Sequence, residues 1–144
     1  MAQRSLWICE RCGRGFANRN QSHACGRYDL AHHFAGKPRE IRALFEAFES
    51  MLRQLGPVTV LPEKTRIAFQ VRMSFAQVTP RQAWLDGHFV LARRVEHKLF
   101  RKVETYSPRN HLHAFRLFSA ADLTPAFRRF AAEAYRVCAQ EHLR

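Results

Sequence analysis

Three cysteines and a histidine near the N-terminus are the residues of this sequence best suited to chemistry. Cys9, Cys12, His23 and Cys25 follow the pattern C-x2-C-x10-H-x-C, which places four metal-binding side chains in one short segment. Thiolate sulfur and imidazole nitrogen are the ligands that zinc takes in closed tetrahedral sites. Gly13, directly after the C-x2-C pair, suits a tight knuckle. The spacing therefore predicts one structural Zn²⁺ ion held by these four residues.

Alternatives to this ligand set and to zinc itself stay open. The H-x-C spacing is tighter than usual for a second ligand pair, so His32 or His33 are alternatives to His23. A thioredoxin-like redox pair would need its CxxC at the start of a helix that follows a strand, whereas Gly13 and a run rich in Arg, Asn and Gln follow here. The segment is too short to bury a core. Metal binding would therefore supply its folding energy, roughly 10–16 kcal/mol in zinc-finger peptides.

Basic residues surround the predicted zinc site and continue through the chain. Three thiolates, a neutral imidazole and a divalent ion leave a net negative charge, which nearby arginines would offset. The same arginines are candidates for phosphate contact: Arg11, Arg14, Arg19 and Arg27. The formal net charge of +12 indicates a nucleic acid or another anionic partner. Because the charges are spread without a block, composition does not distinguish a binding role from a coding bias.

The 144 residues allow the metal segment and one further domain. We expect a zinc-binding finger at 1–30, a linker at 31–36 and an α+β domain at 37–144. The sequence has no run of eighteen apolar residues and lacks the long apolar stretch of a secretory signal near Met1. These features predict a soluble, cytoplasmic protein without a membrane partner.

Hydrophobic periodicity predicts helices at both ends of the larger domain and strands between them. Apolar residues recur at helical spacing after Pro38, until Gly56 and Pro57 end the helix. A period of two then predicts strands at 58–60, 67–75, 84–91, 102–106 and 111–118, with 67–75 as one strand or two joined near Arg72. Thr124 and Pro125 begin a closing helix that runs to about Leu143. The predicted fold is therefore α+β, with a five- or six-stranded, mainly antiparallel sheet packed by N- and C-terminal helices.

Several segments resemble a known family. Lys37-Pro38, LRQLGPV, EKTRIAFQVRMSFAQVTPRQAWL, HLHAFRL and the closing helix together resemble the uncharacterised bacterial family called domain of unknown function 5655, over about residues 32–140. WICERCGRGFANRNQSHAC resembles the small zinc-finger-like segment that precedes this domain in some members, and CxxCGRxF is similar to the start of three-cysteine, one-histidine fingers. The resemblance implies the architecture and offers no established reaction.

Catalytic patterns in the larger domain are weak. Asp86, Glu96 and Lys98 imitate the D-x9-E-x-K pattern of metal-dependent nucleases, but they fit solvated loop charges better. His111 and His113 fall in phase on one predicted strand, where His113 is expected to be a buried structural residue or a pocket residue. We find neither a nucleophile motif nor a glycine-rich phosphate loop.

The polar face of the predicted sheet carries the remaining candidates for anion binding: Lys64, Arg66, Arg72 and Arg116, with His88 nearby and Trp84 as a stacking surface if it shares that face. The sequence thus favours a non-catalytic binding or adaptor protein whose partner is nucleic acid. The alternative is a small-molecule-binding protein or enzyme with an anion pocket between sheet and helices, using Lys64, His113 and Arg116. A finger for protein interaction, with an exposed apolar patch at Trp7 and Phe16, is a third hypothesis.

Overall fold

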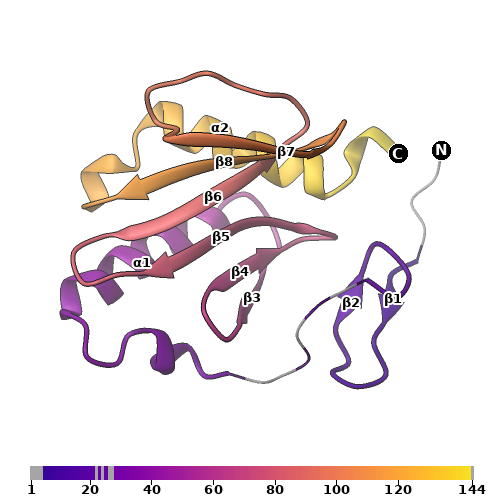
Figure 1. Cartoon of the computed structure of the whole chain (residues 1–144), viewed down its shortest axis with the longest axis horizontal. Coiled ribbons are helices and arrows are strands. Elements are labelled where there is room, and N and C mark those ends of the chain that lie inside the picture. The colour runs from indigo at the N-terminus through magenta and orange to yellow at the C-terminus, as the bar shows by residue number, and fades with distance from the viewer. Residues whose placement is uncertain (1–4, 22, 24, 26–27, 144) are drawn as a thin grey trace.

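The computed structural model of the chain describes residues 5–21, 23, 25 and 28–143. A six-stranded antiparallel sheet has the strand order β3-β4-β5-β6-β8-β7. Figure 1 shows two helices on one face of this sheet and a small β1–β2 hairpin beside it. The bounds are β1 Trp7–Ile8, β2 Gly15–Phe16, α1 Arg39–Arg53, β3 Thr59–Pro62, β4 Ile67–Gln70, β5 Ser74–Pro80, β6 Leu85–Leu91, β7 Lys102–Ser107, β8 Asn110–Leu117 and α2 Pro125–Cys138, with short 3-10 helices at Leu30–His33, Ala120–Asp122 and Glu141–Leu143. The predicted α+β class is confirmed.

Local signals in the sequence set the limits of the two helices. Helix α1 starts directly after Pro38, and Gly56 follows it with a φ of +145°, which L side chains rarely adopt. The hydroxyl of Thr124 accepts a hydrogen bond from the Phe127 N–H at 3.2 Å and thereby caps α2. Helix α2 is shorter than predicted, because it ends at Cys138 and a 3-10 turn follows.

The core lies between the helices and the sheet and consists largely of aromatic rings. Apart from Phe75, six phenylalanine side chains of the core are at most 2% exposed, and neighbouring ring centroids among them lie 4.7 to 6.4 Å apart. They are Phe45, Phe48, Phe69, Phe89, Phe115 and Phe127. Burying one such side chain contributes about 1.5–3 kcal/mol, so this cluster gives the larger domain its own stabilising core.

The run 67–75 forms two strands joined by a short turn. Gln70 pairs with Ser74 and Phe69 pairs with Ala76, which leaves Phe75 as the extra residue of a β-bulge. Phe75 packs against the Tyr135 ring of α2, with ring centroids 5.2 Å apart. The bulge therefore keeps a large apolar side chain on the helix-covered face although the chain reverses direction.

Arg72 consequently lies in the β4–β5 turn rather than on the polar face of a long strand. Its Nε donates to Oε1 of Gln140 at 2.8 Å, and the Met73 N–H donates to the Cys138 carbonyl at 3.1 Å. These contacts hold the turn against the C-terminal end of α2.

No helix in the described part of the chain combines the length and the apolar character needed to cross a membrane.

Gly87 is the residue of the sheet least able to accept a side chain. A Cβ at this position would lie 2.6 Å from the Gln77 carbonyl oxygen and 2.7 Å from the Phe115 ring. Gly87→Ala should therefore lower the free energy of unfolding by about 1–3 kcal/mol, because the ring or the backbone must move. Urea unfolding followed by circular dichroism measures this change. Unchanged stability would mean that the Phe115 ring has room to shift.

Candidate metal centre

The first two cysteines lie in the turn of the β1–β2 hairpin. The Cys9 carbonyl accepts a hydrogen bond from the Gly13 N–H at 2.8 Å, and the Cys9 N–H donates to the Arg14 carbonyl at 2.9 Å. Gly13 has a φ of +75°, which a residue with a Cβ adopts only with strain. The glycine therefore permits the tight turn that brings Cys9 and Cys12 to the same side of the hairpin.

The ligand atoms of Cys9, Cys12, His23 and Cys25 all lie within 4.8 Å of one another, so this group could hold a metal ion. The Nε2 atom of His23 is 3.3 Å from the sulfur of Cys12 and 3.3 Å from the sulfur of Cys25. The sulfurs of Cys9 and Cys25 are 3.8 Å apart, and the cysteines are free rather than disulfide-bonded. A tetrahedron with metal–sulfur bonds of about 2.3 Å has sulfur–sulfur edges of about 3.8 Å. The four side chains therefore have the spacing of a tetrahedral metal site.

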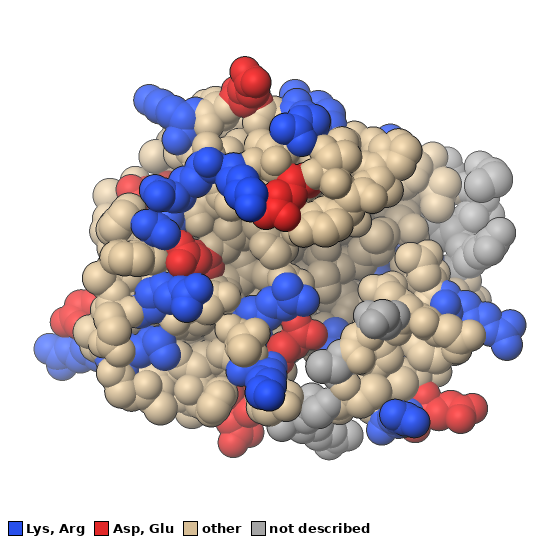
Figure 2. Space-filling model, viewed as in Figure 1, with Lys and Arg blue, Asp and Glu red and all other residues tan. Residues whose placement is uncertain are grey.

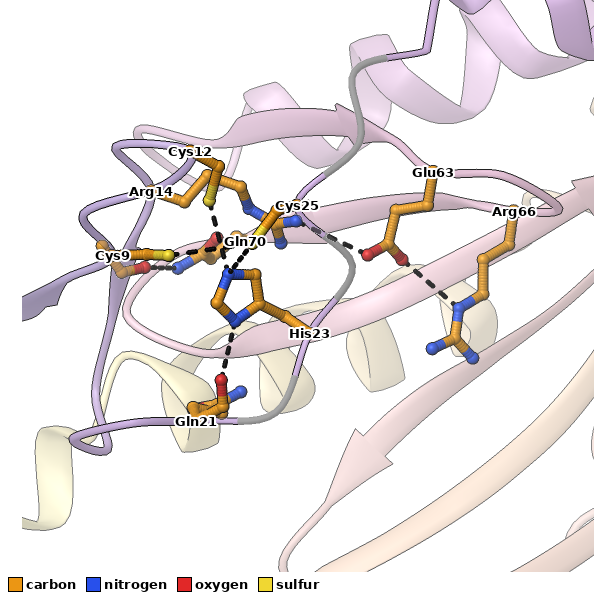
Figure 3. A network of polar contacts seen from close by, with 10 residues as sticks. Cys9, Cys12, Arg14, Gln21, His23, Cys25, Glu63, Arg66 and Gln70 are labelled. Atoms are coloured by element: carbon orange, nitrogen blue, oxygen red, sulfur yellow. Dashed lines mark hydrogen bonds and ion pairs between the residues drawn. The ribbon is translucent and has the colours of Figure 1, made fainter.

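His23 is oriented so that one ring nitrogen is directed at the cysteines. Its Nδ1 donates to the Gln21 carbonyl at 2.7 Å, as Figure 3 shows, and this bond leaves the Nε2 lone pair directed at the sulfurs. The ring also packs on Phe16 with a centroid separation of 4.2 Å. The alternatives His32 and His33 are not members of the group, and His33 instead lies buried in the 3-10 helix at Leu30–His33.

The three cysteine thiols are not equivalent in the metal-free chain. The backbone N–H of Cys12 stabilises the thiolate of Cys9 and lowers its pKa to about 6. Burial raises the pKa of the Cys25 thiol. Because the thiolate is the form that binds metal, Cys9 is more ready than Cys25 to accept an ion at neutral pH.

The hairpin and its metal group, together called the finger (described residues between 5 and 25), pack on the sheet. The side-chain amide of Gln70 on β4 donates to the Gly15 carbonyl at 2.6 Å. Figure 3 also shows Arg14 of the finger beside Glu63, with Nη1 and Oε2 separated by 3.6 Å, and Arg66 on the second oxygen of Glu63 at 3.3 Å. Phe16 is only 4% exposed at this contact. The finger is therefore attached to the β3–β4 end of the sheet.

The contacts to Gln70 define the face on which the finger lies. Cross-strand pairing puts Gln70, Gln77, His88 and Arg116 on the face opposite the helices, called the open face from here on. Burial lowers the pKa of His88 to about 4, so its imidazole is neutral at physiological pH. No role was assigned to Gln77 from the sequence. The alternation of apolar and polar residues over 74–80 nevertheless puts Gln77 on the polar face of the strand.

The basic residues predicted to bind anions fall into separate environments. Arg11 and Arg19 line one cavity of the finger, and Lys64 and Arg66 line another between the finger and the sheet. Arg14 pairs with Glu63, and Arg72 donates to Gln140. Arg116 lies 4.4 Å from the centroid of the Trp84 ring and donates to Asp86 at 2.8 Å. Arg27 is outside the described residues.

His113 lies in the core, where both of its ring nitrogens are occupied. Its Nε2 accepts from the Val95 N–H at 2.9 Å, and its Nδ1 donates to the His111 carbonyl at 2.9 Å. The side chain is fully buried. These bonds fix a neutral tautomer and favour the structural role over the pocket role, the two roles considered for His113.

The nuclease-like pattern does not form a carboxylate pair. Asp86 on β6 binds Arg116 through Oδ1 at 2.8 Å and Arg81 through Oδ2 at 3.1 Å. Glu96 and Lys98 lie in the connection after β6 and are not part of the metal-binding group.

Comparison with known proteins identifies the larger domain. The model of the family "Domain of unknown function (DUF5655)" matches residues 30–137, so the chain belongs to this family. The metal-binding group precedes the matched region. Neither a curated protein nor a solved structure matches the chain.

Loss of one ligand should unfold the finger without unfolding the larger domain. Cys12→Ser should abolish metal binding and disorder the finger, while the larger domain stays folded because its phenylalanine core lies on the other side of the sheet. Elemental analysis and two-dimensional NMR measure both effects. Cys138→Ala is the matched control, because Cys138 is buried in α2 and should leave the metal content unchanged. Cooperative loss of the whole fold in Cys12→Ser would show that the finger is part of the main core.

His88 should make the larger domain less stable in acid. Its pKa of about 4 lies below the usual 6.5, so the unfolded state binds more protons between these values, and stability falls as the pH drops through this window. Between pH 7 and pH 5 the free energy of unfolding should fall in both proteins. The fall should be about 1–2 kcal/mol smaller in His88→Gln than in wild type. Urea unfolding at both pH values measures the difference. Because both proteins carry the same finger, acid release of metal cancels in the comparison, and parallel pH profiles would contradict the prediction.

Proposed function

We propose that this chain is a non-catalytic binding module in which a structural zinc ion orders the finger and the finger contacts nucleic acid. Three thiolates and one imidazole favour zinc over harder cations, which prefer oxygen ligands. Cys9, Cys12, His23 and Cys25 would fill all four tetrahedral positions of such an ion. A closed site of this kind leaves no position for substrate, which supports a structural role for the metal.

The observation that carries the proposal is the cavity on the finger where two arginines meet an aromatic ring. Arg11 and Arg19, eight positions apart in the sequence, line the same cavity of about 370 Å³ as Trp7. Guanidinium groups bind phosphate oxygens, and an indole ring offers a surface on which bases stack. Together they are the side chains that a nucleic-acid strand requires. The net charge of +12 adds long-range attraction for such a partner.

The alternative anion pocket between the sheet and the helices has less support. Buried phenylalanines fill that interface, and His113 has hydrogen-bond partners for both ring nitrogens. Arg116, the cation expected there, lies on the open face with Asp86. Two of the cavities that carry cations border the finger. Another, of about 230 Å³ and lined by Lys98, Arg101 and Arg116 beside Phe115 and Phe127, is the feature that still supports the alternative.

A salt titration with the zinc-loaded chain tests the proposal. Fluorescence anisotropy with short DNA and RNA strands should show binding at low salt that weakens as salt rises, because released counterions favour the complex. The double variant Arg11→Ala and Arg19→Ala should bind more weakly and should flatten the dependence of log K on log salt by about 1.4, which is two contacts at about 0.7 each on a single strand.

Arg39→Ala is the matched control, because Arg39 is a highly exposed arginine at the start of α1, away from the finger. It should leave both the affinity and the salt slope nearly unchanged. Removing zinc with a chelator should have an effect at least as large as the double variant. No affinity for DNA or RNA at low salt would refute the proposed function.

A further inference from the structure

Two cavities on the open face join into one groove beside the finger. The first, of about 300 Å³, lies between the finger and the sheet, with Lys64, Arg66, Ser74 and Gln77 in its lining. The second, of about 190 Å³, continues over β5 and β6 and shares Arg66 and Gln77 with the first. Figure 2 shows this face hollowed between the finger and the strands, with basic and acidic side chains around the hollow. The larger cavity is at the lower end of the volumes found for small-molecule sites.

Cations lie at the finger end of this groove. Lys64 and Arg66 occupy the β3–β4 turn, and the Arg66 side chain is 52% exposed. Glu63, the carboxylate of the same turn, is held by Arg14 on one oxygen and Arg66 on the other. An anionic group entering the groove would therefore find positive charge beside a carboxylate that already has partners.

The floor of the groove carries neutral hydrogen-bonding groups. Gln77 on β5 lies directly opposite His88 on β6. The Oε1 atom of Gln77 is buried and has no hydrogen-bond partner among the described residues. A buried amide oxygen without a partner is unfavourable by about 1–3 kcal/mol, so a ligand that supplies a donor here gains affinity. Asp86 also lines the groove, but Arg81 and Arg116 already donate to its two oxygens. It is therefore a weaker acceptor than Gln77 for a donor on the ligand.

We propose that this groove holds one unpaired base of a single-stranded nucleic acid, with the Gln77 amide on the base edge and the adjoining phosphate at Lys64 and Arg66. A phosphate alone would satisfy the cations but would bring no donor to the Gln77 oxygen, whereas the amino groups of bases do. Glutamine amides pair well with base edges. An unpaired base enters a pocket by leaving the stack, whereas a base within a duplex must also lose its pairing, at a cost of a few kcal/mol, so the groove favours single strands. This inference rests on the proposed nucleic-acid binding and specifies the form of nucleic acid.

Three ligands of equal length test the groove separately from the finger: a single strand, the same strand with abasic sites, and a duplex. Zinc-loaded wild type should bind the base-bearing strand about tenfold more tightly than the abasic strand, which keeps the phosphates but lacks the base edges. Gln77→Leu keeps a similar volume but removes the acceptor, and it should lose about tenfold for the base-bearing strand only. Lys64→Ala should weaken both single strands to the same degree, because it removes a phosphate contact.

Gln54→Leu is the matched control, since Gln54 is exposed at the end of α1 and lies away from the open face. If Gln77→Leu does not fold, the side-chain amide resonance of Gln77 in wild type gives the answer, because it should shift with the base-bearing strand and not with the abasic one. Equal binding of the base-bearing strand by wild type and Gln77→Leu would overturn the groove proposal while leaving the proposed function intact. No binding to any of the three ligands would overturn both.

Discussion

The N-terminal structure depends on one interaction, the meeting of Cys9, Cys12, His23 and Cys25 in a group that could hold a metal ion. Among the described residues of the finger, only Cys9 and Phe16 are buried, so apolar burial cannot offset the conformational entropy lost when this segment folds. Metal binding contributes on the order of 10–16 kcal/mol in comparable peptides, which is enough to do so. The hydrogen bond from His23 to the Gln21 carbonyl then directs the imidazole toward the metal position. A metal ion held by these four residues would therefore order the finger in place of a core.

The fold of the finger also affects the shape of the open face, because the finger packs there. The finger presents the Gly15 carbonyl to Gln70 and the Arg14 guanidinium to Glu63, and these contacts attach it to the sheet. His23, a ligand, also lines the cavity between the finger and the sheet. The groove is thus bounded on one side by residues of the group that could hold a metal ion. The larger domain supplies the other side from strands that its own core stabilises.

Features that depend on neighbouring residues in the sequence could be predicted. Features that depend on contacts between residues far apart in the sequence could not. The apolar period of α1 and the cap at Thr124 are local signals, and both helices begin as they predict. The ligand spacing is local too, and the four predicted ligands lie together in a group that could hold a metal ion. The reversal near Arg72 was ambiguous, because a β-bulge at Phe75 preserves an alternating pattern across a turn. The attachment through Gln70 joins residues 55 positions apart, and periodicity carries no information about such a contact.

Charge shows why composition alone overstates the binding surface. The +12 net charge is spread over arginines that serve different purposes. Arg116 is tied to Asp86 and lies over Trp84, and this stacking also occupies the ring that was a candidate platform for bases. Arg93 is held by both oxygens of Glu133, which raises the pKa of its guanidinium. Arginines in such pairs stabilise the fold and have fewer donors left for a partner. The arginines left for an anionic partner are therefore fewer than the net charge suggests.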